Sequence, residues 1–110
     1  MTGWLPEGTS EWAGMPVART VAEAAPRRRA VLTGSLRAVR ERVTPAPCCD
    51  AVLDDGTGAI TLRWVGRRHL PGIDCGRAVT VEGTVLDQHG LLVLLNPLYR
   101  FCGSAPATSG

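Results

Sequence analysis

The residues of this 110-residue sequence with the clearest potential for chemistry are arginines in two clusters. The clusters are Arg37, Arg40 and Arg42, and then Arg63, Arg67 and Arg68. Guanidinium groups bind phosphate through paired hydrogen bonds and stack on flat rings, and a single-stranded nucleic acid offers both. The clusters therefore predict a polyanion-binding surface if the fold brings them together. The alternative is a set of solvated strand ends that block edge pairing.

The other reactive residue types form no catalytic or metal-binding pattern. Asp54 and Asp55 are adjacent, which is typical of a turn rather than of a pair of catalytic carboxylates. His69 and His89 have no cysteine or acidic residue at ligand spacing, so we expect surface histidines. All twelve basic residues are arginine, so no lysine is present to occupy a Walker A loop. We expect a protein that is not an enzyme and that needs no metal and no cofactor.

The four cysteines also lack a zinc-binding pattern. Cys48, Cys49, Cys75 and Cys102 include no CxxC pair. We expect reduced and partly buried thiols, with a metal site or a redox switch as the alternative. If Cys48 and Cys49 lie in a strand, their side chains point to opposite faces.

Length and composition predict one globular domain. Hydrophobic residues make up 45% of the chain and charged residues 20%. No apolar run reaches the roughly 18 residues of a membrane span, and no secretory signal is recognisable, so we expect a cytoplasmic location without membrane contact. The charge is uneven: residues 1–26 hold one arginine and three glutamates, whereas residues 27–102 hold eleven arginines and seven acidic residues.

Five segments predict the strands that must position the arginines. They are Arg29–Val43, Cys48–Asp54, Ala59–Val65, Arg77–Asp87 and Leu91–Leu95. The Asp- and Gly-rich stretch between the second and third segments predicts a tight hairpin. Gly34, inside the first segment, predicts a bulge or a sharp bend. Residues 66–76 form an irregular connector, and Tyr99, Phe101 and Cys102 are expected to close over one end.

Alternation in the third segment predicts which side chains face the core. Ile60, Leu62 and Trp64 share one face, and Thr61 and Arg63 share the other. Trp64 is therefore expected in the core, with stacking under a base as the alternative, and Tyr99 has the same two options. Aromatic residues make up only 5% of the chain, which favours binding dominated by phosphate contacts.

The chain is expected to divide into three parts. These are a partly ordered N-terminal arm (1–26), a barrel (27–102) and a disordered tail (103–110). Within the arm, Thr20 and Glu23 predict a capping box at the start of a short helix over Val21–Ala25. The first ten residues are expected to be disordered.

Five short strands with little helix predict an all-β Greek-key barrel of the oligonucleotide/oligosaccharide-binding (OB) type. The sequence resembles the OB-fold nucleic-acid-binding family, particularly the wedge domain of RecG-type DNA helicases and small stand-alone actinobacterial OB-fold proteins. The resemblance covers about Arg28 to Arg100. Its matching segments are Leu32–Leu36, Asp54–Gly58, Ile60–Trp64, Pro71–Gly76, Val81–Val85 and Asn96–Tyr99.

The resemblance implies a non-enzymatic module that binds single-stranded or branched DNA, with RNA also open, and a role in repair or recombination by analogy. Binding is expected through arginine–phosphate contacts on the face of the second and third strands. The implied contact residues are Arg37, Arg40, Arg42, Thr61, Arg63, Arg67 and Arg68, with Trp64 and Tyr99 as stacking candidates.

Two further hypotheses remain open at this point. One is a protein–protein interaction barrel, an adaptor or a homo-oligomer, in which Leu91–Leu95 and Leu98 offer an apolar edge or patch. The other is an autoinhibitory role for the acidic residues 1–26, folded over the basic face.

Overall fold

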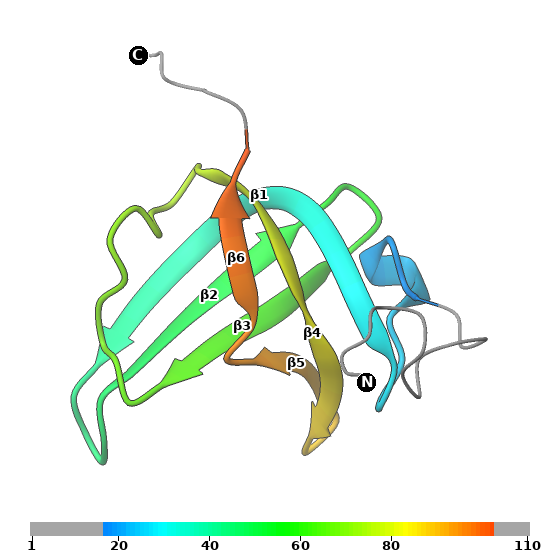
Figure 1. Ribbon diagram of the computed structural model, residues 1–110. Coiled ribbons are helices and arrows are strands. Elements are labelled where there is room, and N and C mark those ends of the chain that lie inside the picture. Colours follow the sequence, from blue (N-terminus) through cyan, green and yellow to red (C-terminus); the bar gives the residue numbers. More distant parts are fainter. Residues whose placement is uncertain (1–16, 103–110) are drawn as a thin grey trace, which may run out of the picture.

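The computed structural model describes residues 17–102, and these form a barrel of strands with one short helical turn (Figure 1). The elements are η2 (Val21–Glu23), β1 (Arg29–Arg42), β2 (Cys48–Asp54), β3 (Ala59–Val65), β4 (Ala78–Gln88), β5 (Leu91–Leu95) and β6 (Leu98–Phe101). No helix among the described residues is long and apolar enough to cross a membrane. The expected disorder of the first ten residues and of the tail 103–110 falls outside the described residues.

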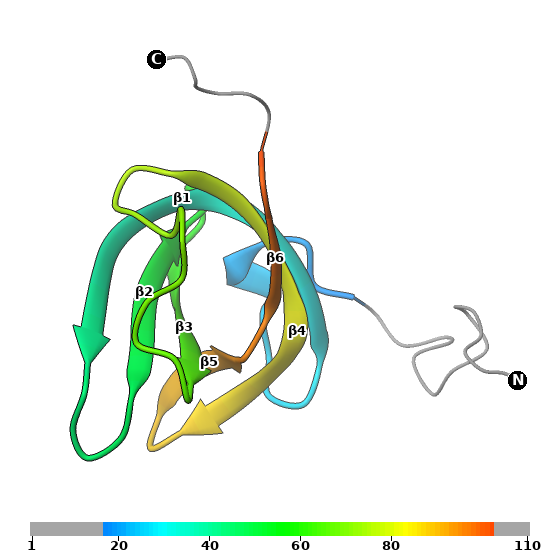
Figure 2. The ribbon, with the colours of Figure 1, turned by 60° about the vertical axis from the view of Figure 1, so that its left-hand side comes forward.

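Five strands close into a ring, which confirms the expected all-β barrel (Figure 2). β1 pairs with β2 and with β4, and β2 pairs with β3. β5 closes the ring because it runs parallel to β3 and antiparallel to β4. The five expected segments match these strands to within one residue at each end.

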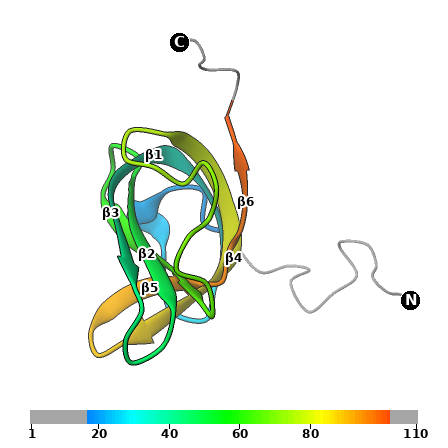
Figure 3. The ribbon, with the colours of Figure 1, turned by 90° about the vertical axis from the view of Figure 1, so that its left-hand side faces the viewer.

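A sixth strand, β6, was not expected. Leu98–Phe101 pairs antiparallel with β4, from Val79 to Glu82. Figure 3 shows β6 running along β4, on the side of the barrel away from β2 and β3. Four residues after a proline are too few to show an alternating pattern, so only the pairing with β4 reveals this strand.

Gly34 marks the place where β1 changes partner. β1 pairs with β4 from Arg29 to Ser35 and with β2 from Ser35 onward. A Cβ atom on Gly34 would lie 2.4 Å from the carbonyl oxygen of Asp54, so only glycine allows this close approach. The bend expected at Gly34 is therefore confirmed.

A β-bulge after this bend changes which side chains of β1 face outward. The β1–β2 register shifts between Leu36 and Ala38. Before the shift the buried residues have even numbers, as at Leu32 and Leu36, and after it Val39 packs against the core. The even-numbered residues after the bulge, such as Arg40, therefore point to the outer face.

Trp64 lies in the barrel core, as its alternation predicts. Its side chain is 5% exposed, and its indole N–H donates to the carbonyl oxygen of Pro97 at 3.0 Å. Tyr99 contacts the Trp64 ring edge-on with centroids 5.6 Å apart, and Phe101 contacts Tyr99 in the same way. Tyr99 and Phe101 thus pack against the core as expected, and stacking under a base is not open to Trp64 in this structure.

The described part of the N-terminal arm binds to the β2–β3 turn rather than forming a capped helix. The backbone N–H of Val21 donates to the Asp55 carboxylate at 2.8 Å, and that of Ala22 donates to the Thr57 hydroxyl at 3.1 Å. The expected capping box is wrong: the Thr20 side chain makes no cap, and the Glu23 carboxylate accepts from the Arg19 N–H. Side chains from the turn satisfy the free N–H groups that a local cap would otherwise satisfy.

Candidate nucleic-acid interface

Two rows of side chains run side by side across the outer face of β1, β2 and β3. In one row Arg40 pairs with Asp50, and Asp50 pairs with Arg63 on the next strand. The neighbouring row contains small side chains, Ala38, Val52 and Thr61. Together with Ala51 these residues line a hollow of about 210 Å³, called here the outer hollow. None of the described residues that line it is aromatic.

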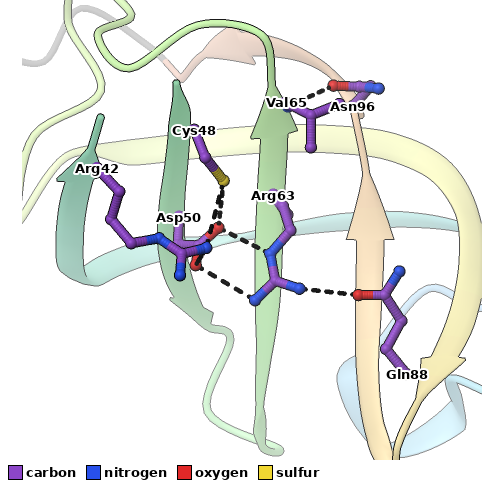
Figure 4. Close-up of polar contacts among 7 residues, drawn as sticks. All are labelled: Arg42, Cys48, Asp50, Arg63, Val65, Gln88 and Asn96. Carbon is purple, nitrogen blue, oxygen red and sulfur yellow. Dashed lines mark hydrogen bonds and ion pairs between the residues drawn. The ribbon is translucent and has the colours of Figure 1, made fainter. Parts of the chain in front are cut away.

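Asp50 is the centre of a polar network on this face (Figure 4). Its carboxylate accepts from Nε and Nη2 of Arg63, at 2.9 and 3.2 Å, and from Nη2 of Arg42 at 3.2 Å. The thiol of Cys48 donates to the same carboxylate at 3.4 Å. On its other side, Arg63 donates from Nη1 to the side-chain oxygen of Gln88 at 2.8 Å. The network therefore connects β1, β2, β3 and β4.

The network keeps its charges at neutral pH. Partial burial acts to raise the pKa of Asp50, but hydrogen bonds from Arg63 and Cys48 and the charges of Arg63 and Arg42 outweigh it, so this pKa lies below its ordinary value. The hydrogen bond with Asp50 raises the pKa of Arg63. Two arginines share one carboxylate, and the face is left with an excess of positive charge.

Of the first arginine cluster, only Arg40 has no ion pair within residues 17–102. Arg37 pairs with Asp54, and Arg42 pairs with Asp50 while its Nε atom is buried without a hydrogen-bond partner. Arg40 is exposed at the rim of the outer hollow. Sequence reasoning grouped these three arginines, and the structure separates one exposed cation from two that carboxylates hold.

The second cluster lies beside the end of β1, so the fold brings the two clusters together. Arg42 pairs with Cys48, which pairs with Val65 at the end of β3. The N–H of Gly66 then donates to the carbonyl oxygen of Pro47 at 2.9 Å, which fixes the following connector against the β1–β2 loop. Arg67 and Arg68 are exposed on this connector, and neither makes an ion pair with any described residue.

His69 differs from expectation because it has an acidic partner. Its Nδ1 atom lies 2.8 Å from Oε2 of Glu41, although the side chain is exposed as predicted. The two residues are 28 positions apart, and only the return of the connector to the end of β1 brings them together. Tyr99 lies on β6, which among the described strands pairs with β4 alone, and so it is not part of the β1–β2–β3 face.

The residues that sequence reasoning missed are Asp50 and Gln88, the two partners of Arg63. A carboxylate in the interior of Cys48–Asp54, with cysteine before it and alanine after it, was an available signal for Asp50. Gln88 had none, because its contact with Arg63 depends on the closure of the ring through β5.

The remaining residues of reactive type, two aspartates and four cysteines, have structural rather than catalytic surroundings. Asp54 accepts the N–H of Gly56 at 2.7 Å and Asp55 accepts that of Thr57 at 2.9 Å, so both form the turn as predicted. All four cysteines are free thiols, with Cys48 and Cys49 buried. Within the part of the chain that the structure describes, no three His, Cys, Asp or Glu side chains are placed to hold a metal ion.

No protein-family model matches this sequence, and no curated protein matches it either. Solved structures match the barrel. The second OB-fold domain of replication protein A from Methanococcus maripaludis aligns with a TM-score of 0.62 and 15% identity, over 78% of this chain and 95% of that domain. The barrel has the OB fold. This fold assignment confirms the architecture that the resemblance implied.

Two other solved structures that match the barrel differ in function from each other. A replication protein A heterotrimer bound to single-stranded DNA aligns at a TM-score of 0.55 and 19% identity, over 66% of this chain. A chain described as an aspartyl-tRNA synthetase from Leishmania major Friedlin aligns at 0.55 and 14%, over 69% of this chain. This chain spans about half of the first neighbour (56%) and about a fifth of the second (18%). At these identities the likeness defines the fold and not the ligand.

Proposed function

We propose that this OB-fold domain is a non-enzymatic module that binds single-stranded or branched nucleic acid, with DNA as the first candidate. OB folds bind oligonucleotides across the face of their second and third strands, between the loops that join strands one and two and strands four and five. Here that face carries the outer hollow, with Arg40 and Arg63 at its edge. The match to a replication protein A bound to single-stranded DNA supports nucleic acid as the ligand class.

The ion pairs divide the arginines by role. Arg40, Arg67 and Arg68 make no ion pair with a described residue, and these three are proposed to contact phosphates. Carboxylates already hold Arg37, Arg42 and Arg63, so their contribution to phosphate binding is smaller. With three phosphate contacts on a single strand, the slope of log K against log salt is about −2, and affinity falls roughly 20-fold between about 50 and 200 mM salt.

The test measures fluorescence anisotropy with labelled DNA of about 20 nucleotides, longer than the roughly 4–16 nucleotides that one OB fold occupies. A single strand, its duplex and a forked junction are each titrated at low and moderate salt. Replacing Arg40, Arg67 and Arg68 by Gln is expected to remove most binding. The matched control replaces Arg19, Arg28 and Arg100 by Gln, which makes the same change in charge elsewhere. Equal losses in both variants would contradict a localised site, and no binding at low salt would reject the proposal.

The ranking of the three DNAs tests the finer part of the proposal. The resemblance to the RecG wedge domain predicts that the forked junction binds more tightly than the single strand or the duplex. A module like that of replication protein A is expected to favour the single strand. Equal affinity for all three would indicate recognition of the phosphate backbone alone.

One observation favours the alternative of a protein-binding barrel. β5 pairs with β4 from Leu91 to Leu94 and with β3 from Val93 to Leu95, so most of its edge is occupied, although Leu91 is 48% exposed. Leu98, however, is 69% exposed on the edge strand β6. Sedimentation velocity at rising concentration would test self-association. A shift that Leu98→Asp removes without loss of folding would support it, and a monomer at high concentration would reject it.

A further inference from the structure

Arg63 is the best-fixed cation on the outer face. Its guanidinium uses three of its five N–H groups in hydrogen bonds, two to Asp50 and one to Gln88. In Figure 4 the Arg63 guanidinium lies between the Asp50 carboxylate on one side and the Gln88 side chain on the other. Both partners lie at its edges, and its side chain remains 24% exposed where it lines the outer hollow. What Arg63 presents to the hollow is therefore mainly its flat face.

This arrangement is poorly suited to phosphate. A phosphate that approaches the two remaining N–H groups would lie close to the Asp50 carboxylate, and like charges at short distance repel each other. A nucleobase has no such penalty. The flat face of a guanidinium stacks on aromatic rings and attracts their π electrons, and hydrogen bonds at its edge leave that face available.

The space beside Arg63 fits a ring. Ala38, Val52 and Thr61 form the neighbouring row, and their small side chains leave the hollow of about 210 Å³ unfilled. Arg40 lies across β2 from Arg63, two strand spacings away and so on the order of 10 Å. That separation is on the scale of one nucleotide, with its phosphate at Arg40 and its base at Arg63.

We propose that Arg63 is a stacking platform for a nucleobase, held flat by Asp50 and Gln88, and that Arg40 binds the phosphate of the same nucleotide. This inference rests on the proposed function and makes the ligand an unpaired nucleotide rather than a bare polyanion. An arginine here takes the role of the aromatic side chain that is missing among the described lining residues of the outer hollow. It also means that a duplex, whose bases are stacked on each other, cannot use this contact.

The test compares two ligands of the same length, an oligothymidylate of about 20 nucleotides and a base-free strand with the same phosphate backbone. Arg63→Lys keeps the positive charge but loses the flat group. We expect it to weaken binding of the oligothymidylate about 10-fold, as for loss of one stacked base, and to change binding of the base-free strand less than twofold. Arg40→Lys keeps a phosphate-binding charge and is expected to change little on either ligand.

Two further variants complete the experiment. Gln88→Leu keeps Arg63 but removes one of its partners, so it is expected to weaken only the oligothymidylate, and by less than Arg63→Lys does. Arg40→Gln is expected to make the salt slope shallower by about 0.7 on both ligands, because it loses one phosphate contact. Thermal unfolding of each variant checks that the barrel remains folded.

The outcomes separate this inference from the proposed function. If the native protein binds neither strand, both fail. If it binds both strands equally and Arg63→Lys has no effect, or weakens both equally, the stacking role fails and the nucleic-acid-binding function stands. A loss confined to the strand that carries bases supports both.

Discussion

Gly34 of β1 lies against the backbone of Asp54 at the end of β2, and a Cβ atom on Gly34 would be 2.4 Å from the Asp54 carbonyl oxygen. The obstacle is backbone, which cannot rotate away as a side chain can. Gly34→Ala is therefore expected to push β1 and β2 apart at the bend and to lower the free energy of unfolding by roughly 3 kcal/mol. Urea denaturation monitored by circular dichroism measures this loss.

Gly83 of β4 provides the matched control for that variant. It pairs with Ala30 of β1 in the same sheet, and a Cβ there would meet its nearest atoms at 3.6 Å, an ordinary contact distance. Gly83→Ala is expected to change stability by less than about 1 kcal/mol, because the unfolded chain loses freedom while the folded chain is not strained. Similar losses in the two variants would mean that contact with Asp54 is not what requires glycine at position 34.

The bend at Gly34 can be predicted from the sequence. The bulge that follows it, which sets the face that Arg40 occupies, cannot. A glycine inside a run of apolar residues indicates a bend, and its neighbours on both sides alternate as strands do. The bulge between Leu36 and Ala38 has no comparable signal, because no glycine or proline marks it. That bulge decides which face Arg40 occupies, so alternation counted along the segment assigns the wrong face beyond it.

The arginines that form the candidate site could be predicted from the sequence, but the ion pairs and hydrogen bonds that they make could not. The clusters containing Arg40 and Arg63 do lie on one face, on β1 and β3 with β2 between them, because a hairpin and a closed barrel leave few other arrangements. The register of three strands decides which arginine pairs with a carboxylate. Asp50 lies opposite Arg63 only in the register that the structure shows. Gln88 joins through ring closure, which no local pattern encodes.

Trp64 provides a test of the buried aromatic core. Trp64→Phe removes the indole N–H and leaves the carbonyl of Pro97 without its partner, so the expected loss of stability is about 1–2 kcal/mol. Affinity for oligothymidylate is expected to stay within twofold, because no base reaches the buried ring. Denaturation and anisotropy on the same variant check both statements. A large loss of affinity with an intact fold would show that the barrel opens to expose Trp64.

The contact between the N-terminal segment and the β2–β3 turn gives a third prediction. Thr57→Val keeps the side-chain shape but removes the hydroxyl that accepts the N–H of Ala22 and donates to Asp55 at 2.6 Å. We expect the segment to detach more often and trypsin to cleave after Arg19 several-fold faster, with a loss of stability of about 1 kcal/mol. Thr84→Val on β4, far from this turn in sequence, is the control. Unchanged cleavage would mean that Asp55 alone holds the segment.

Acid stability tests the network around Asp50. The pKa of Asp50 is lower in the folded protein than in the unfolded chain, so below about pH 4 the unfolded chain takes up more protons and stability falls as pH decreases. Asp50→Asn is expected to lower the free energy of unfolding by about 2 kcal/mol at pH 7, since it loses charged hydrogen bonds with Arg63 and Arg42.

The pKa values of Asp54 and Asp55 are also lowered, so the Asp50→Asn variant keeps part of the acid response. The difference between the native protein and Asp50→Asn should therefore shrink below about pH 4. Denaturant unfolding from pH 7 to pH 3, with the exposed Asp74→Asn as control, measures this difference, and a constant gap would show that Asp50 is not linked to the arginines in solution.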